Sequence, residues 1–123
     1  MVTKEFCDEL AGVGLDVQEM IAHFMDNENM FLKYLYKFFD SADSVVLELT
    51  SAAEKEDYQQ MLFTAHALKG LAGNIGLNGV FLPAKKIVDE IRAGDTSECG
   101  EDFRRLQENY YKAAAIARKY KQA

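Results

Sequence analysis

The chain has 123 residues, of which 49% are hydrophobic and 28% are charged. This size and balance suit one globular domain over residues 1–123 and exclude two domains of ordinary size. The formal net charge of −6 opposes the basic surface that binds nucleic acid or an anionic membrane, so we expect neither partner.

The sequence shows no apolar run of the roughly 18 residues that a membrane span needs, and its first residues lack the apolar segment of a signal peptide. We therefore expect a cytoplasmic protein. Cys7 and Cys99 are far apart and have no histidine cluster beside them, which predicts two ordinary thiols and no metal site.

Two short helices are expected at the start of the chain. Thr3 is a good N-cap for the first, which should end near Gly12. Asp16 should cap the second, which should end near Asn27. His23 lies off the apolar stripe of the second helix and has no basic or metal-binding neighbours, so it is expected to be an ordinary surface histidine.

Four longer helices should follow. The first covers residues 27–53, and apolar residues at steps of three and four predict its inward side: Met30, Phe31, Tyr34, Leu35, Phe38, Val45, Leu49 and Ala52. Asp57 should cap the next helix. After a turn at residues 78–79, Pro83 should lie in the first turn of the following helix, which should end at Gly94.

The last helix should start after a polar loop over residues 95–100. Its predicted inward residues are Phe103, Leu106, Tyr110, Ala113, Ala114 and Ala117. Long helices joined by short loops predict an all-α fold, an antiparallel up-down four-helix bundle with one or two short N-terminal helices packed on one end.

The stretch over residues 64–77 combines helical periodicity with glycines at 70, 73 and 76. Each glycine inside a helix costs roughly 1 kcal/mol relative to alanine, so something other than helix stability selects them. At about 100° per residue, one stripe collects the apolar residues Met61, Ala65, Leu68, Ala72 and Ile75. His66 points away from that stripe, beside Gly70 and Gly73, with Lys69 at its flank. We therefore expect the imidazole on an exposed, sterically open face with a cation nearby.

This face suits a phosphoryl acceptor. A neutral imidazole keeps a free lone pair near neutral pH. A phosphoryl group on a carboxylate is already activated, so an in-line transfer to imidazole needs mainly positioning and charge neutralisation. The sequence lacks a phosphate-binding glycine-rich loop and a Mg²⁺-binding carboxylate cluster, so a partner is expected to supply the rest of the site.

The run His66-Ala67-Leu68-Lys69-Gly70, with Gly76 ten residues after the histidine, resembles the signature of histidine-containing phosphotransfer (HPt) domains. The similarity extends to Gly14-Leu15-Asp16-Val17 with the helix that follows, and to residues 81–94. The resemblance implies a monomer that accepts a phosphoryl group on His66 from a receiver-domain aspartate and passes it to another receiver aspartate.

The resemblance also assigns roles to the neighbours of His66. Lys69 would neutralise phosphoryl oxygens, Gly70 would clear space for the receiver, and Gly76 would serve the helix end. The partners would be response-regulator receiver domains, including one in a hybrid sensor histidine kinase. The chain itself would have no kinase activity and no cofactor, because Mg²⁺ would belong to the receiver.

The predicted docking surface for a receiver comprises Gln59, Phe63, Gly70 and Gly73. Each member also has a plainer interpretation, since Phe63 can pack under a neighbouring helix and the glycines can mark close helix contacts. Leu71 and Ala72 stand where small hydroxyl residues often follow the glycine of the family, and Val88 stands where some relatives carry a polar side chain.

Two other functions were weighed. A helical module that binds and inhibits a receiver or a sensor kinase without being phosphorylated remains an alternative. A sensor kinase core is not expected, because it would need an ATP-binding domain that these 123 residues do not contain.

Overall fold

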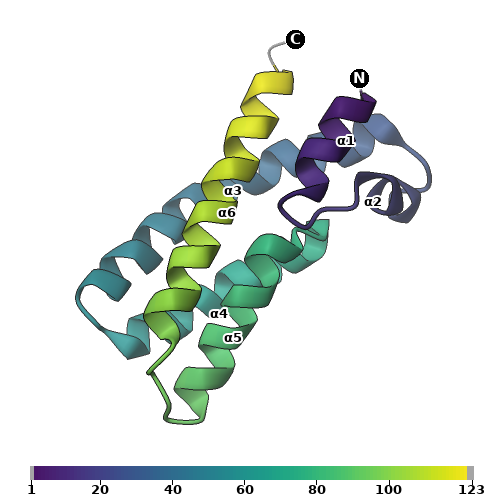
Figure 1. Cartoon of the computed structure of the whole chain (residues 1–123). Helices are drawn as coiled ribbons and strands as arrows, with labels where there is room; N and C mark the ends of the chain where they lie inside the picture. Colours follow the sequence, from purple (N-terminus) through teal and green to yellow (C-terminus); the bar gives the residue numbers. More distant parts are fainter. Residues whose placement is uncertain (1, 122–123) are drawn as a thin grey trace.

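The computed structural model describes residues 2–121, which form six α-helices and no strand (Figure 1). The predicted all-α fold is confirmed. None of the helices within these residues is both long and apolar enough to cross a membrane.

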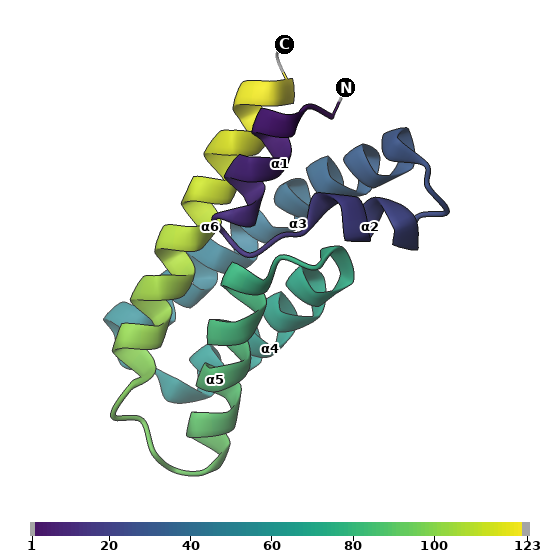
Figure 2. The ribbon, with the colours of Figure 1, turned by 45° about the vertical axis from the view of Figure 1, so that its right-hand side comes forward.

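Two short helices open the chain, α1 (Lys4–Ala11) and α2 (Val17–His23). The Thr3 side chain accepts a hydrogen bond from the backbone N–H of Phe6, and Asp16 does the same for Glu19, so both predicted N-caps are confirmed. Helix α1 packs against α6 and α2, and α2 packs against the beginning of α3 (Figure 2).

The longest helix is α3 (Glu28–Glu54), and its predicted inward side is partly wrong. Met30 is 40% exposed and Tyr34 is 47% exposed. Phe24, which directly follows α2, stacks on Tyr34 with ring centroids 5.2 Å apart. Tyr34 also borders an open hollow between α3 and α4, so its ring is covered only in part. Further along, the predicted Val45 is only half-buried. The buried side of α3 comprises Phe31, Leu35, Phe38, Phe39, Ala42, Val46, Leu49 and Ala52.

Helices α4 (Tyr58–Ile75) and α5 (Asn78–Arg92) are joined without the predicted turn at residues 78–79, because both residues already belong to α5. The first turn of α5 has no side-chain cap. Instead, the loop between α1 and α2 caps it, since the carbonyls of Val13 and Gly14 accept hydrogen bonds from the N–H groups of Gly79 and Asn78 at 3.0 and 3.2 Å. A Cβ on Gly79 would lie 2.2 Å from the Val13 oxygen, so only glycine permits this contact.

Pro83 lies inside α5 and not in its first turn, so that prediction is wrong. Proline has no N–H to donate to the carbonyl four residues earlier, which here belongs to Gly79. The side-chain amide of Asn109, in α6, donates to this carbonyl at 2.8 Å. A contact between helices therefore replaces the hydrogen bond that proline removes.

The last helix is α6 (Cys99–Lys121). It buries most of the predicted residues, but Phe103 is only half-buried, whereas Cys99 and Asp102 are buried in addition. Helix α3 packs on α4, α4 on α5 and α5 on α6, and α6 also contacts α3 (Figures 1 and 2). Short connections make successive helices run in opposite directions around one apolar core.

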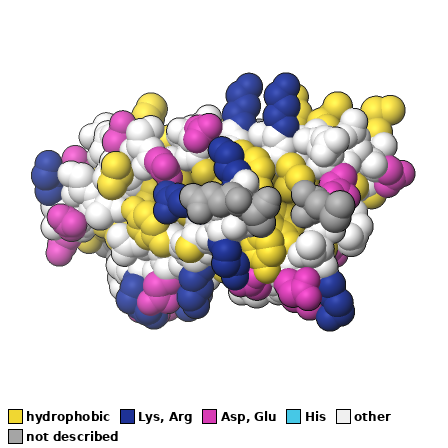
Figure 3. Space-filling view, turned by 90° about the horizontal axis from the view of Figure 1, so that it is seen from above, with side chains coloured by type: hydrophobic (Ala, Val, Ile, Leu, Met, Phe, Trp, Pro, Cys, Tyr) yellow, Lys and Arg dark blue, Asp and Glu magenta, His cyan; other side chains and the backbone are white. Residues whose placement is uncertain are grey.

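The end of the molecule that carries both termini has a mixed surface. Acidic and basic side chains alternate over it, with hydrophobic side chains between them (Figure 3). The described side chains of this face thus form no continuous field of one sign.

Candidate functional site

Helix α4 carries His66 and has well-defined ends. The Asp57 side chain accepts a hydrogen bond from the backbone N–H of Gln60 at 3.1 Å, as predicted. At the other end, Gly76 has a left-handed φ of 72°, and the N–H of Leu77 donates to the carbonyl of Ala72, which closes the last turn. The predicted apolar stripe is buried: Met61, Ala65, Leu68, Ala72 and Ile75. Because this stripe anchors α4 in the core, the opposite side of the helix is presented rigidly to solvent.

His66 lies on that opposite side and is exposed. Gly70, one turn further along, is exposed as well. A Cβ built on Gly70 would have no heavy atom within 4 Å beyond the neighbouring backbone of its own helix. Packing within the described chain therefore gives no reason for a glycine at this position, and the space beside the imidazole is open.

An apolar hollow of about 510 Å³ adjoins the imidazole. Its lining residues are Gln59, Leu62, Phe63, His66 and Ala67. Phe63 is 70% exposed, so it does not pack under a neighbouring helix. Gln59, Phe63 and His66 were singled out from the sequence and lie together here, whereas Leu62 and Ala67 were missed. We call these five residues the α4 hollow.

Gly73 has a packing reason of its own. A Cβ at this position would lie 3.2 Å from the Phe81 ring of α5, which is tighter than most real contacts. Gly73 also borders a second hollow, with Met20, His23, Phe24 and Asn74. The structure thus places Gly73 against α5 and α2, apart from the α4 hollow, and brings the exposed His23 to this end of α4.

Charged residues of α5 flank the same side of α4. Lys85 donates a hydrogen bond to Asp89 at 2.7 Å, and this bond lowers the pKa of the Asp89 carboxyl below its usual range. The charges of Lys69 and Arg92 act on Asp89 in the same direction, so both cations lie near it. Lys69, Lys85 and Arg92 thus all lower the pKa of this one carboxyl. Val88, in contrast, is fully buried.

A group of side chains close enough to share a cation lies away from His66 in the described part of the chain. Among residues 2–121, the group of carboxylates, cysteines and histidines close enough to share a cation is Glu90, Glu98 and Asp102, without either histidine. The arrangement at His66 is an exposed imidazole on a rigid helix, with an apolar hollow on one side and open space over Gly70 on the other. An imidazole placed in this way is sterically accessible to a group that another molecule brings.

Known proteins were compared with the chain in three ways. No curated protein and no solved structure matches it. The family model of the Hpt domain matches residues 33–116, which include all of α4 and α5 and most of α3 and α6. This match covers the exposed histidine, its flanking helices and more than half of the chain, and the chain therefore belongs to the Hpt domain family.

Proposed function

We propose that this protein is a phosphoryl carrier that accepts a phosphoryl group on His66 from the aspartyl phosphate of a receiver domain and passes it to an aspartate of another receiver. Membership of the Hpt domain family implies histidine phosphotransfer in phosphorelay signalling. The single observation that carries the proposal to a residue is the exposed imidazole of His66 between the α4 hollow and the open space over Gly70.

The reaction needs no further nucleophile. The lone pair of one imidazole nitrogen attacks phosphorus, an N–P bond forms, and the O–P bond of the acyl phosphate breaks with its electron pair going to the aspartate carboxylate. Because the leaving group is a stabilised carboxylate, positioning and charge neutralisation suffice for catalysis. The second transfer is the reverse reaction with a different receiver.

Lys69 is the proposed counter-charge for the phosphoryl oxygens. It is only half-exposed, one turn from His66, and Asp89 is already paired with Lys85. Lys69 is therefore not needed as the partner of Asp89, and its positive charge stays available to an incoming anion. A Lys69→Gln variant should slow the transfer while still accepting label on His66.

The α4 hollow is the proposed docking surface for the receiver. An exposed phenylalanine above an apolar depression is typical of an interaction site, and buried aromatic anchors carry much of the energy of such contacts. Gly70 would leave room for the receiver backbone next to the imidazole. The receiver would bring its own acidic pocket and Mg²⁺, so this chain would need no cofactor and would have no kinase activity of its own.

The proposal extends to the state of the protein. We expect one domain over residues 1–123 that acts as a cytoplasmic monomer, because a carrier must expose the same face to two receivers in turn. A hybrid sensor histidine kinase is a natural source of the donor receiver. Sedimentation at the concentration of the transfer assay tests the monomer.

The test is phosphotransfer from receivers labelled with radioactive phosphate in the presence of Mg²⁺. The wild type should take up label from at least one receiver of the source organism, and His66→Gln should take up none. Phe63→Ala should weaken receiver binding, whereas Tyr111→Ala, which removes an exposed aromatic ring from α6, should not. If a receiver binds equally well to wild type and His66→Ala but no label ever moves, the chain is an inhibitory interaction module and not a carrier.

A further inference from the structure

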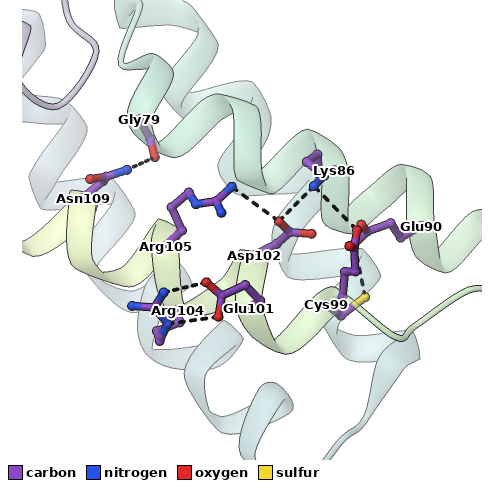
Figure 4. Close-up of polar contacts among 10 residues, drawn as sticks. Gly79, Lys86, Glu90, Cys99, Glu101, Asp102, Arg104, Arg105 and Asn109 are labelled. Carbon is purple, nitrogen blue, oxygen red and sulfur yellow. Dashed lines mark hydrogen bonds and ion pairs between the residues drawn. The ribbon is translucent and has the colours of Figure 1, made fainter.

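Three carboxylates gather where α5 ends and α6 begins, away from His66. Glu90 comes from α5, Glu98 immediately precedes α6, and Asp102 lies in the first turn of α6. One oxygen from each lies within 4.8 Å of the other two. We call these three residues the carboxylate cluster. Figure 4 shows Glu90 and Asp102 pointing toward one another from the two helices.

Asp102 is the exceptional member because it is only 1% exposed. Its Oδ1 atom has Lys86 Nζ at 3.3 Å and Arg105 Nη1 at 3.9 Å. Its Oδ2 atom is buried and has no hydrogen-bond partner among the described residues. In Figure 4 this second oxygen lies on the side of Glu90. A buried carboxylate oxygen without a partner is costly, so a group that satisfies it is expected in the cluster.

The basic side chains near the cluster do not contact Asp102 Oδ2. Lys86 contacts Asp102 Oδ1 and lies 3.8 Å from Glu98 Oε2, but its side chain is about half exposed and does not reach Oδ2. Cys99 Sγ donates a weak hydrogen bond to Glu90 Oε1 at 3.7 Å. Lys86 therefore pairs with Asp102 Oδ1 and Glu98 Oε2, while Asp102 Oδ2, on the side of Glu90, has no hydrogen-bond partner among the described residues.

The carboxylate oxygens of the cluster favour a particular class of metal ion. Ca²⁺ binds oxygen at about 2.3–2.6 Å, so oxygens on opposite sides of the ion lie roughly 4.6–5.2 Å apart. Mg²⁺ binds oxygen at about 2.0–2.1 Å in a strict octahedral geometry and usually keeps several waters, whereas Ca²⁺ accepts flexible sets of protein oxygens. Carboxylate oxygens also favour hard cations over softer metals. The three oxygens of the cluster lie within 4.8 Å of one another, close enough to contact one such cation.

We propose that Glu90, Glu98 and Asp102 form a binding site for a hard divalent cation such as Ca²⁺ or Mn²⁺. The ion would satisfy Asp102 Oδ2 and would tie the end of α5 to the start of α6, with water completing its coordination. This site is separate from the phosphoryl chemistry. The α5 carboxylate on the side of Lys69 is Asp89, which pairs with Lys85, and it is not a member of the carboxylate cluster.

Two measurements on the full chain test the site. Burial and a hydrogen bond that protonated Glu90 shares with Asp102 raise the pKa of Glu90 to about 7. Protons therefore compete with the ion, and the titrations belong at about pH 8, where Glu90 has lost that proton. Calorimetric titration with Ca²⁺ should show one saturable site, and Ca²⁺ should raise the midpoint of thermal unfolding, because it binds only the folded chain. In NMR spectra, low concentrations of Mn²⁺ should first broaden the amide signals around residues 90, 98 and 102.

Variants separate the site from general acidity. Glu98→Gln changes an exposed side chain, so it should fold normally and weaken Ca²⁺ binding by about tenfold or more. Asp102→Asn should abolish binding in protein that a circular dichroism spectrum shows to be folded. Lys86→Met should strengthen binding, since it removes a competing cation. The matched control is Glu101→Gln, whose carboxylate pairs with Arg104 outside the cluster and whose loss should leave the affinity unchanged.

The opposite results would overturn the proposal. Absence of saturable binding at about millimolar Ca²⁺ and Mn²⁺ would mean that the buried oxygen shares only a proton with Glu90. Equal loss of affinity in Glu98→Gln and Glu101→Gln would mean diffuse attraction to an acidic surface.

Discussion

Gly70→Ala separates the two reasons for which a glycine can stand inside α4. A methyl group at this exposed position would have no heavy atom within 4 Å beyond the neighbouring helix backbone, so alanine should bring its helix propensity at no steric cost. The expected gain is about 1 kcal/mol in the free energy of unfolding. With an unfolding entropy of about 2.1 cal/mol/K per residue over 123 residues, the melting temperature should rise by about 4 °C.

The same methyl group would occupy the space beside His66 that docking is proposed to need. The initial rate of transfer from a phosphorylated receiver should therefore fall although the protein is more stable. Gly73→Ala is the matched control, because it brings the same propensity but places its Cβ 3.2 Å from the Phe81 ring, and its melting temperature should rise less. An unchanged transfer rate in a stabilised Gly70→Ala would refute the docking role, and an unchanged melting temperature would refute the packing argument.

Three further predictions concern the fold. Asp57→Ala removes the N-cap of α4 and should lower the free energy of unfolding by about 1 kcal/mol in a urea titration. A loss below the error of the titration would mean that the cap contributes nothing to stability. Asn109→Ala leaves the partly buried Gly79 carbonyl without a donor and should lower the free energy of unfolding by about 1–3 kcal/mol. In a Pro83→Ala background, which restores a backbone donor, the loss should be smaller, and equal losses in both backgrounds would contradict this reasoning. Hydrogen bonds from Lys119 and Tyr120 lower the pKa of Glu9 below its ordinary value of 4.5. The stabilising contribution of Glu9 should therefore be complete above about pH 4.5 and disappear as the pH falls further. Parallel acid-unfolding curves for the wild type and Glu9→Gln would exclude this contribution.

The starts of α1, α2 and α4 were predictable because their chemistry is local. Thr3, Asp16 and Asp57 each accept a hydrogen bond from the backbone N–H three residues later. This contact depends only on the capping side chain and the first turn of its own helix. The periodicity of α4 likewise predicts which of its sides is buried. The exposure of His66 follows from that pattern, although exposure alone does not test its role.

The errors come from contacts between distant parts of the chain. Pro83 is tolerated inside α5 because Asn109 supplies the missing donor from another helix. Tyr34 is half-exposed because Phe24 stacks on it while an open hollow between α3 and α4 borders it. At the site, Leu62 and Ala67 complete the α4 hollow, a detail of surface shape that helical periodicity does not resolve.

The charges beside Lys69 were missed for the same reason. Lys85 and Asp89 show the four-residue spacing of a helix-surface ion pair, which the sequence does contain. Their position beside α4 depends on how α5 rotates against it, and the close contact between Gly73 and Phe81 is one of the features that fix this rotation.

Locating the phosphoryl group is the most direct test of the central claim. After reaction with a phosphorylated receiver and Mg²⁺, the protein is digested under alkaline conditions and its peptides are mapped by mass spectrometry. The account predicts one acid-labile phosphoryl group on a ring nitrogen of His66, absent from His66→Gln and unaffected by His23→Gln. A phosphoryl group on any other residue, or none from any receiver of the source organism, would contradict it.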